Sequence, residues 1–87
     1  MPTLQPQLMP PSNEVTLQNV LRAVLNLAPD IDVTRVRQLS YPAWDSLAHV
    51  SLIAALESEF GLEIDVSDSV DLTSYQAVLL YIESRGR

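Results

Sequence analysis

The sequence predicts an all-α fold: a small helical bundle of three main helices and one short helix, with a long loop between the first two main helices. Three observations support this prediction. The chain has 87 residues, the size of one small domain. Hydrophobic residues make up 47% of it, enough to form a compact core. Apolar residues recur every three or four positions over segments of about 12 to 15 residues, longer than typical strands.

The segment 1–13 is expected to be a flexible, proline-rich N-terminal arm ahead of a folded domain at 14–85. It contains four of the six prolines and no charged residue, and proline disfavours both helix and sheet interiors. It lacks the basic start and the continuous apolar run of a signal peptide. No stretch of the sequence is apolar over the length needed to cross a bilayer. We therefore expect a cytoplasmic protein.

The first helix is expected to begin at Glu14, with Ser12 or Asn13 as its cap. Pro29 is expected to end it shortly after residue 27, because the residue before a proline disfavours the helical conformation. Its apolar face recurs at spacings of three and four. That face comprises Val15, Leu17, Val20, Leu21, Val24 and Leu27.

The connection over residues 28–44 is long for a small domain, and a loop of this length is usually functional or held down by its own apolar residues. Four apolar residues are spaced regularly along it, so we expect the loop to pack on the core. They are Ile31, Val33, Val36 and Leu39.

The second main helix is expected to start at Asp45-Ser46, with Asp45 as its N-cap, and to stop at Gly61. Its apolar residues recur at helical spacing and predict a buried stripe. The stripe comprises Leu47, Val50, Ile53, Leu56 and Phe60, and Leu52 broadens it.

Residues 62–72 predict a turn and one short helix, with Ile64, Val70 and Leu72 pointing inward. The last helix is expected to begin at a capping box, in which the Thr73 hydroxyl and the Gln76 amide satisfy each other's backbone donors.

The charge of the chain excludes several functions. The formal net charge is −6, and residues 38–84 contain eight acids and no base. Such a surface repels nucleic acid and anionic membranes, and attracts proteins with basic patches. The chain has no cysteine and one histidine, His49, so neither a thiolate nucleophile nor a cysteine or multi-histidine metal site is expected.

Asp45-Ser46-Leu47 stands where the long loop meets the second main helix. A serine in the first turn exposes its hydroxyl, and the helix dipole there favours an attached anion. Ser46 is thus well placed for a phosphate ester, although a plain capping role is the common alternative. A hydrolytic triad of Ser46, His49 and Asp45 is not expected, because no second loop supplies an oxyanion hole.

From about residue 14 to 84 the sequence resembles the acyl carrier protein family. The resemblance rests on one three-residue motif at the start of the second main helix and on further matching positions from there to the end of the last helix. The matching residues are Asp45-Ser46-Leu47, Val50, Leu52, Ala55-Leu56-Glu57, Glu59-Phe60, Glu63-Ile64, Thr73, Gln76-Ala77 and Tyr81-Ile82.

This resemblance implies a carrier and not an enzyme. A phosphopantetheinyl transferase would attach 4′-phosphopantetheine to Ser46, flanked by Asp45 and Leu47. The thiol of the arm would hold acyl groups as thioesters for biosynthetic enzymes with basic docking patches. For partner docking, the resemblance implies the acidic positions Asp45, Glu57 and Glu59 and the exposed apolar Leu47. Trp44, His49 and Ala54 are further docking candidates on their own chemistry or place, and Trp44 is equally suited to covering the bundle. The core positions Val50, Leu56 and Val78 match the region that can enclose an acyl chain. We expect a monomer.

Several positions differ from the carriers of fatty acid synthesis. Ala48, Ser51 and Ser58 stand where those carriers usually have acids, and Ala43-Trp44 replaces small residues before the motif. With His49, this pattern looks more like carriers of secondary-metabolite (polyketide-like) or other specialised pathways. Two alternatives stay open: a peptidyl or aminoacyl carrier, and an unmodified acidic helical module that binds basic partners.

Overall fold

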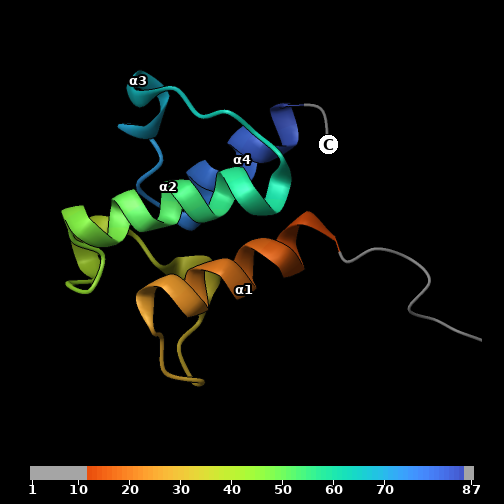
Figure 1. Ribbon diagram of the computed structural model, residues 1–87. Coiled ribbons are helices and arrows are strands. Elements are labelled where there is room, and N and C mark those ends of the chain that lie inside the picture. Colours follow the sequence, from red (N-terminus) through yellow and green to blue (C-terminus); the bar gives the residue numbers. More distant parts are fainter. Residues whose placement is uncertain (1–11, 86–87) are drawn as a thin grey trace, which may run out of the picture.

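The computed structural model describes residues 12–85, and within that range it confirms the all-α fold (Figure 1). Residues 1–11 of the expected N-terminal arm lie outside the described residues. The described elements follow in this order: α1 Asn13–Leu25, the 3₁₀ turns η2 Val33–Arg35 and η3 Gln38–Ser40, α2 Ser46–Phe60, α3 Val66–Ser69 and α4 Tyr75–Ser84. No helix in residues 12–85 is both long enough and apolar enough to cross a membrane.

Helix α1 begins at Asn13, one residue before the predicted Glu14, and ends earlier than predicted. The Ser12 hydroxyl caps it by accepting from the Val15 amide at 3.2 Å. Asn26 then adopts a left-handed conformation (φ 53°), which stops the helix at Leu25. The Arg22 guanidinium holds the following turn by donating to the carbonyl oxygens of Ala28 and Ile31. The expected inward position of Val15 is wrong, because this residue lies in the exposed first turn.

The long loop packs on the core through three of its four apolar residues. Val33 and Val36 are buried, and Ile31 packs partly against the core. Leu39 was expected to point inward and is instead fully exposed, because it lies in the middle of η3, a turn with no buried residue.

Helix α2 has the predicted ends and a different buried face. Asp45 caps it and Gly61 terminates it with φ 64°. The predicted stripe is wrong at Leu47 and Val50, which are 77% and 66% exposed. Apolar residues occur on every side of this helix, so spacing alone does not select the inner face. The side chains of α2 that face the core are spaced by four residues and centred on Leu52 and Leu56.

Helix α4 begins one residue later than the predicted capping box. The cap is Ser74, whose hydroxyl accepts from the Ala77 amide at 3.1 Å. The carbonyl oxygen of Thr73 accepts from the Gln38 amide at 2.8 Å, and the Tyr75 amide donates to the Val36 carbonyl. These two bonds hold residues 73–75 against the loop as a short antiparallel bridge, and the helix starts after it.

The core lies between α1, α2 and α4, with the loop residues closing it. Helices α1 and α2 run side by side in opposite directions, and α3 stands apart from the three long helices (Figure 1). None of the four residues of α3 is buried. The flanking Ile64 and Leu72 point inward as predicted, but Val70 is exposed. The buried residues are Leu17, Val20, Leu21, Leu25, Val33, Val36, Trp44, Leu52, Leu56, Ile64, Leu72, Tyr75, Val78 and Ile82.

Candidate functional site

Ser46 is the first residue of α2, and its side chain is exposed. The preceding Asp45 has extended backbone, and its Oδ1 accepts from the Ala48 amide at 2.9 Å. The Asp45 carbonyl oxygen also accepts from the His49 amide at 2.9 Å. Asp45 therefore fixes the first turn of the helix, while the Ser46 hydroxyl makes no hydrogen bond to any residue in the range 12–85.

The start of α2 provides an electrostatic setting that suits an attached phosphate. The helix has 15 residues, and its aligned peptide dipoles place partial positive charge at this end. Asp45 accepts from the Ala48 amide, whereas the amides of Ser46 and Leu47 make no hydrogen bond within residues 12–85 and so stay available to an anion. A phosphodiester on Ser46 would lie in this favourable field and remain accessible to solvent.

Trp44 is not a surface residue, which corrects its expected role in partner docking. Its side chain is 1% exposed and belongs to the core. Its indole Nε1 donates to Nδ1 of His49 at 3.0 Å, and the two rings stack at 27° with centroids 6.1 Å apart. The large indole is buried because it closes the Ser46 end of the bundle.

His49 is half-buried, and both of its ring nitrogens are engaged. Nδ1 receives the indole hydrogen of Trp44, and Nε2 lies 2.8 Å from the carbonyl oxygen of Ser69. An indole nitrogen only donates and a carbonyl oxygen only accepts. With these partners, Nδ1 acts as the acceptor and Nε2 as the donor. The predicted docking role of His49 does not fit this arrangement, since neither nitrogen faces a partner.

The remaining docking candidates divide into two groups. Leu47, Ala54 and Glu59 are exposed on α2. Glu57 is half-buried, and its Oε2 accepts from the Ile64 amide at 2.9 Å. Glu57 thus braces the loop after α2, and only part of its charge is available to a partner.

Sequence reasoning missed three exposed apolar residues near this site. Val50 lies on the outer side of α2, and Val66 and Val70 lie at the two ends of α3. A usable signal was present for Val50: it is four residues before Ala54 and three after Leu47, which are both outward-facing candidates. The four-residue helix α3 is too short for periodicity to assign its faces.

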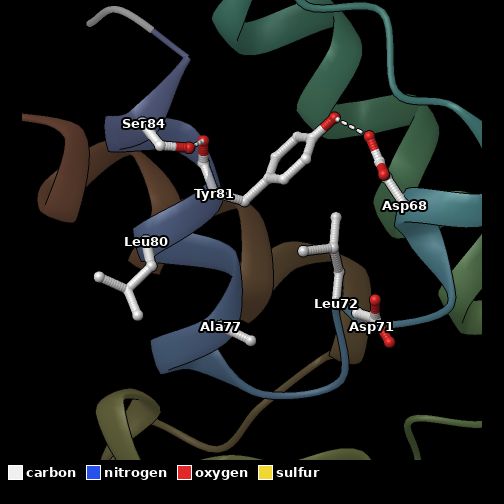
Figure 2. A pocket seen from close by; sticks show the side chains of 7 residues that line it. All are labelled: Asp68, Asp71, Leu72, Ala77, Leu80, Tyr81 and Ser84. Atoms are coloured by element: carbon white, nitrogen blue, oxygen red, sulfur yellow. Dashed lines mark hydrogen bonds between the residues drawn. The ribbon is translucent and has the colours of Figure 1, made fainter.

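An open groove lies between α3 and α4, and none of the predicted site residues lines it (Figure 2). Tyr81 reaches across it, and its hydroxyl donates to Oδ2 of Asp68 at 3.1 Å. The same oxygen accepts from Arg85 at 2.9 Å. Burial of the phenol, and then its hydrogen bond to Asp68, raise the pKa of Tyr81 above 10.0. These polar groups satisfy one another, so the groove presents a structural link and no reactive group.

Comparison with known proteins gives one clear relative. No protein-family model matches the chain. The sequence is 38% identical over 74 residues to a protein named "Acyl carrier protein" from Campylobacter hominis. The alignment covers 82% of this chain and 90% of that protein.

Proposed function

The chain belongs to the acyl carrier protein family, and on that premise we propose that Ser46 is the residue that bears a 4′-phosphopantetheine arm. The family relationship makes the chain a carrier protein and not an enzyme. The carrier domain of this proposal is residues 14–85, and its place of action is the cytoplasm.

The single observation that carries this assignment is the state of Ser46 at the start of α2. Its side chain is exposed and unengaged by residues 12–85, while its neighbour Asp45 does the capping. A transferase can therefore reach the hydroxyl without first breaking a helix cap. In the transfer, the Ser46 oxygen forms a new bond to the phosphorus of coenzyme A that carries the pantetheine. The phosphoanhydride bond breaks, adenosine 3′,5′-bisphosphate leaves, and the hydroxyl proton passes to a base of the transferase.

The arm supplies the thiol that this cysteine-free chain lacks. Acyl groups joined to that thiol as thioesters would be presented to biosynthetic enzymes. We propose that these partners dock on a carrier face made of Leu47, Val50, Ala54 and Glu59. Its three apolar side chains are exposed on the same helix as Ser46, and the net charge of −6 draws partners with basic patches.

The pathway we propose is a specialised one, of the polyketide-like or another secondary kind. Two features support it. Ala48, Ser51 and Ser58 leave α2 with fewer acids than fatty acid carriers have, so a partner with a strongly basic patch gains less here. Trp44 and His49 form a buried hydrogen-bonded pair at the Ser46 end of the bundle.

The assignment of Ser46 is tested by intact-protein mass spectrometry. The unmodified chain is incubated with coenzyme A and a broad-specificity phosphopantetheinyl transferase, beside Ser46→Ala and Ser51→Ala. We expect a gain of one phosphopantetheine in the wild type and in Ser51→Ala, and none in Ser46→Ala. A gain in Ser46→Ala would refute the site. No gain in any variant, with a transferase active on another carrier, would favour an unmodified interaction module.

A second experiment tests the class of cargo. The modified protein is offered to acyl-activating and aminoacyl-activating enzymes in parallel, and thioester formation is read by mass. Acyl loading without aminoacyl loading is the expected result. The reverse would identify a peptidyl or aminoacyl carrier.

A further inference from the structure

One imidazole connects three parts of the chain around the start of α2. Trp44 ends the loop before the capping residue, His49 lies one turn into the helix, and Ser69 is the last residue of α3. Nδ1 of His49 accepts from Trp44 Nε1 at 3.0 Å, and Nε2 donates to the Ser69 carbonyl oxygen at 2.8 Å. We call this arrangement the Trp44–His49–Ser69 bridge.

Water cannot take the place of His49 as the acceptor for the Trp44 N–H group. The Trp44 side chain is 1% exposed, so water has almost no access to its N–H group. A buried donor that loses its acceptor is strongly disfavoured. Without His49, the indole N–H would lack an acceptor, and any movement of this buried side chain toward another acceptor would press on its close-packed surroundings, including the backbone at residue 44.

A shift of Trp44 reaches Ser46 through one residue. Asp45 lies between them with extended backbone, and its Oδ1 and carbonyl oxygen hold the amides of Ala48 and His49. A rotation at residue 44 therefore changes the cap of α2 and the direction of the Ser46 hydroxyl. At the other end of the bridge, α3 has no buried residue, so the link to His49 is one of few contacts that locate it.

We propose that His49 is a positioning residue for Ser46: through the Trp44–His49–Ser69 bridge it sets the direction in which the serine hydroxyl meets the phosphorus of coenzyme A. It acts through Trp44 and touches neither reactant. The proposal deepens the proposed function and rests on it.

The test compares His49→Leu with His49→Gln in the transferase reaction, with carrier concentration varied. Leucine keeps an apolar side chain of similar size and removes both ring nitrogens. Glutamine keeps one acceptor and one donor; its donor is about as far from the backbone as Nε2, and its acceptor is one bond farther than Nδ1. We expect His49→Leu to lower kcat by about 10- to 100-fold with little change in KM, the cost of a misplaced reacting group. His49→Gln is expected to recover most of that loss.

The separation of kcat from KM distinguishes positioning from a general loss of structure. A partly unfolded carrier lowers the concentration of usable substrate, which raises the apparent KM and leaves kcat at saturation unchanged. A rise in KM alone for His49→Leu would therefore overturn the proposal. So would a variant with wild-type kinetics.

Tyr81→Phe is the matched control. It removes the Tyr81 bond to Asp68 of α3 and keeps the Trp44–His49 hydrogen bond, which is the part of the bridge next to Ser46. We expect wild-type kcat in this variant. If Tyr81→Phe lowers kcat as much as His49→Leu does, loosening of α3 explains both losses and the role assigned to His49 fails.

A second readout uses the unmodified protein and no transferase. Trp44 is the single tryptophan, so its indole N–H gives one assignable resonance in a nitrogen-edited NMR spectrum. We expect this N–H group to exchange faster with solvent in His49→Leu, and to remain protected from exchange in His49→Gln. Unchanged exchange in His49→Leu contradicts the bridge itself. A wild type that gains no arm refutes the proposed function, whereas wild-type kinetics in His49→Leu refute only this inference.

Discussion

The hydroxyl of Tyr81 donates to Oδ2 of Asp68 at 3.1 Å and thereby joins the last helix to the shortest one (Figure 2). Arg85 donates to the same oxygen at 2.9 Å, and its guanidinium lies 4.6 Å from the centre of the Tyr81 ring. Both charged partners are well exposed, so the ion pair itself adds little. The half-buried phenol is the stronger part of this link.

Removing the Tyr81 hydroxyl should loosen α3. We expect Tyr81→Phe to lower the free energy of unfolding by about 0.5–1.5 kcal/mol, the usual net worth of one hydrogen bond. Urea denaturation measures the change in the unfolding free energy of the whole protein. The rate of amide hydrogen exchange should increase most at Val66–Ser69. Tyr41→Phe is the control, because the Tyr41 hydroxyl makes no hydrogen bond within residues 12–85. Equal losses in both variants would contradict the link.

The same tyrosine predicts a dependence of stability on alkaline pH. Its pKa is raised above 10.0 by burial of the phenol and by the bond to Asp68. A group with a raised folded-state pKa stabilises the protein below its unfolded pKa and loses that effect as the pH rises through the folded value. We expect the Tyr81 contribution to be complete below pH 10 and to fade above it. Ultraviolet titration of wild type against Tyr81→Phe should show one tyrosine ionising late, and coincident curves would rule out the shift.

Asp45 should stabilise α2 through its side chain. We expect Asp45→Ala to cost about 0.5–2 kcal/mol, because the Ala48 amide loses its capping acceptor. Asp45→Asn keeps an oxygen at this position and should cost much less. Thermal or urea unfolding of both variants measures the difference. If alanine and asparagine are equally costly, the loss comes from the charge and not from the cap.

Leu47 should matter for partners and not for folding. Its side chain is 77% exposed, so Leu47→Ser is expected to change the unfolding free energy by less than about 0.5 kcal/mol. The kcat/KM for modification should fall, mainly through KM, as docking area is lost. Leu80→Ser is the control, since Leu80 is similarly exposed on α4. A similar fall in both variants would indicate a nonspecific effect of surface polarity.

The helices and their ends were predictable because local chemistry decides them. Ser12 and Asp45 cap the starts of α1 and α2 through their side chains, and Gly61 ends α2 through its left-handed backbone. The start of α4 shifted from Thr73 to Ser74 because of a pairing with the distant loop at Arg37. Local sequence contains no information about that pairing.

The faces of α2 were less predictable. Leu47 and Val50 fit the same helical spacing as the buried residues, and only the packing of α1 and α4 selects the inner side. The exposed serine at the helix start was correctly placed by the sequence, since the cap beside it is a local feature. The partner of Trp44 was not foreseeable, because the bond to His49 depends on how the loop turns back over α2.

Helix α3 has a physical consequence beyond its links to His49 and Tyr81. Its four residues bury no side chain, so lifting it from the bundle exposes little new apolar surface. The heat capacity of a protein rises with the apolar area that becomes exposed, and a step that exposes little leaves it almost unchanged. Detachment of α3 would therefore add little to the heat-capacity change that calorimetry measures on unfolding. Alkalinity, which acts on Tyr81, would shift that equilibrium more than ionic strength, which acts on the exposed pair of Asp68 and Arg85.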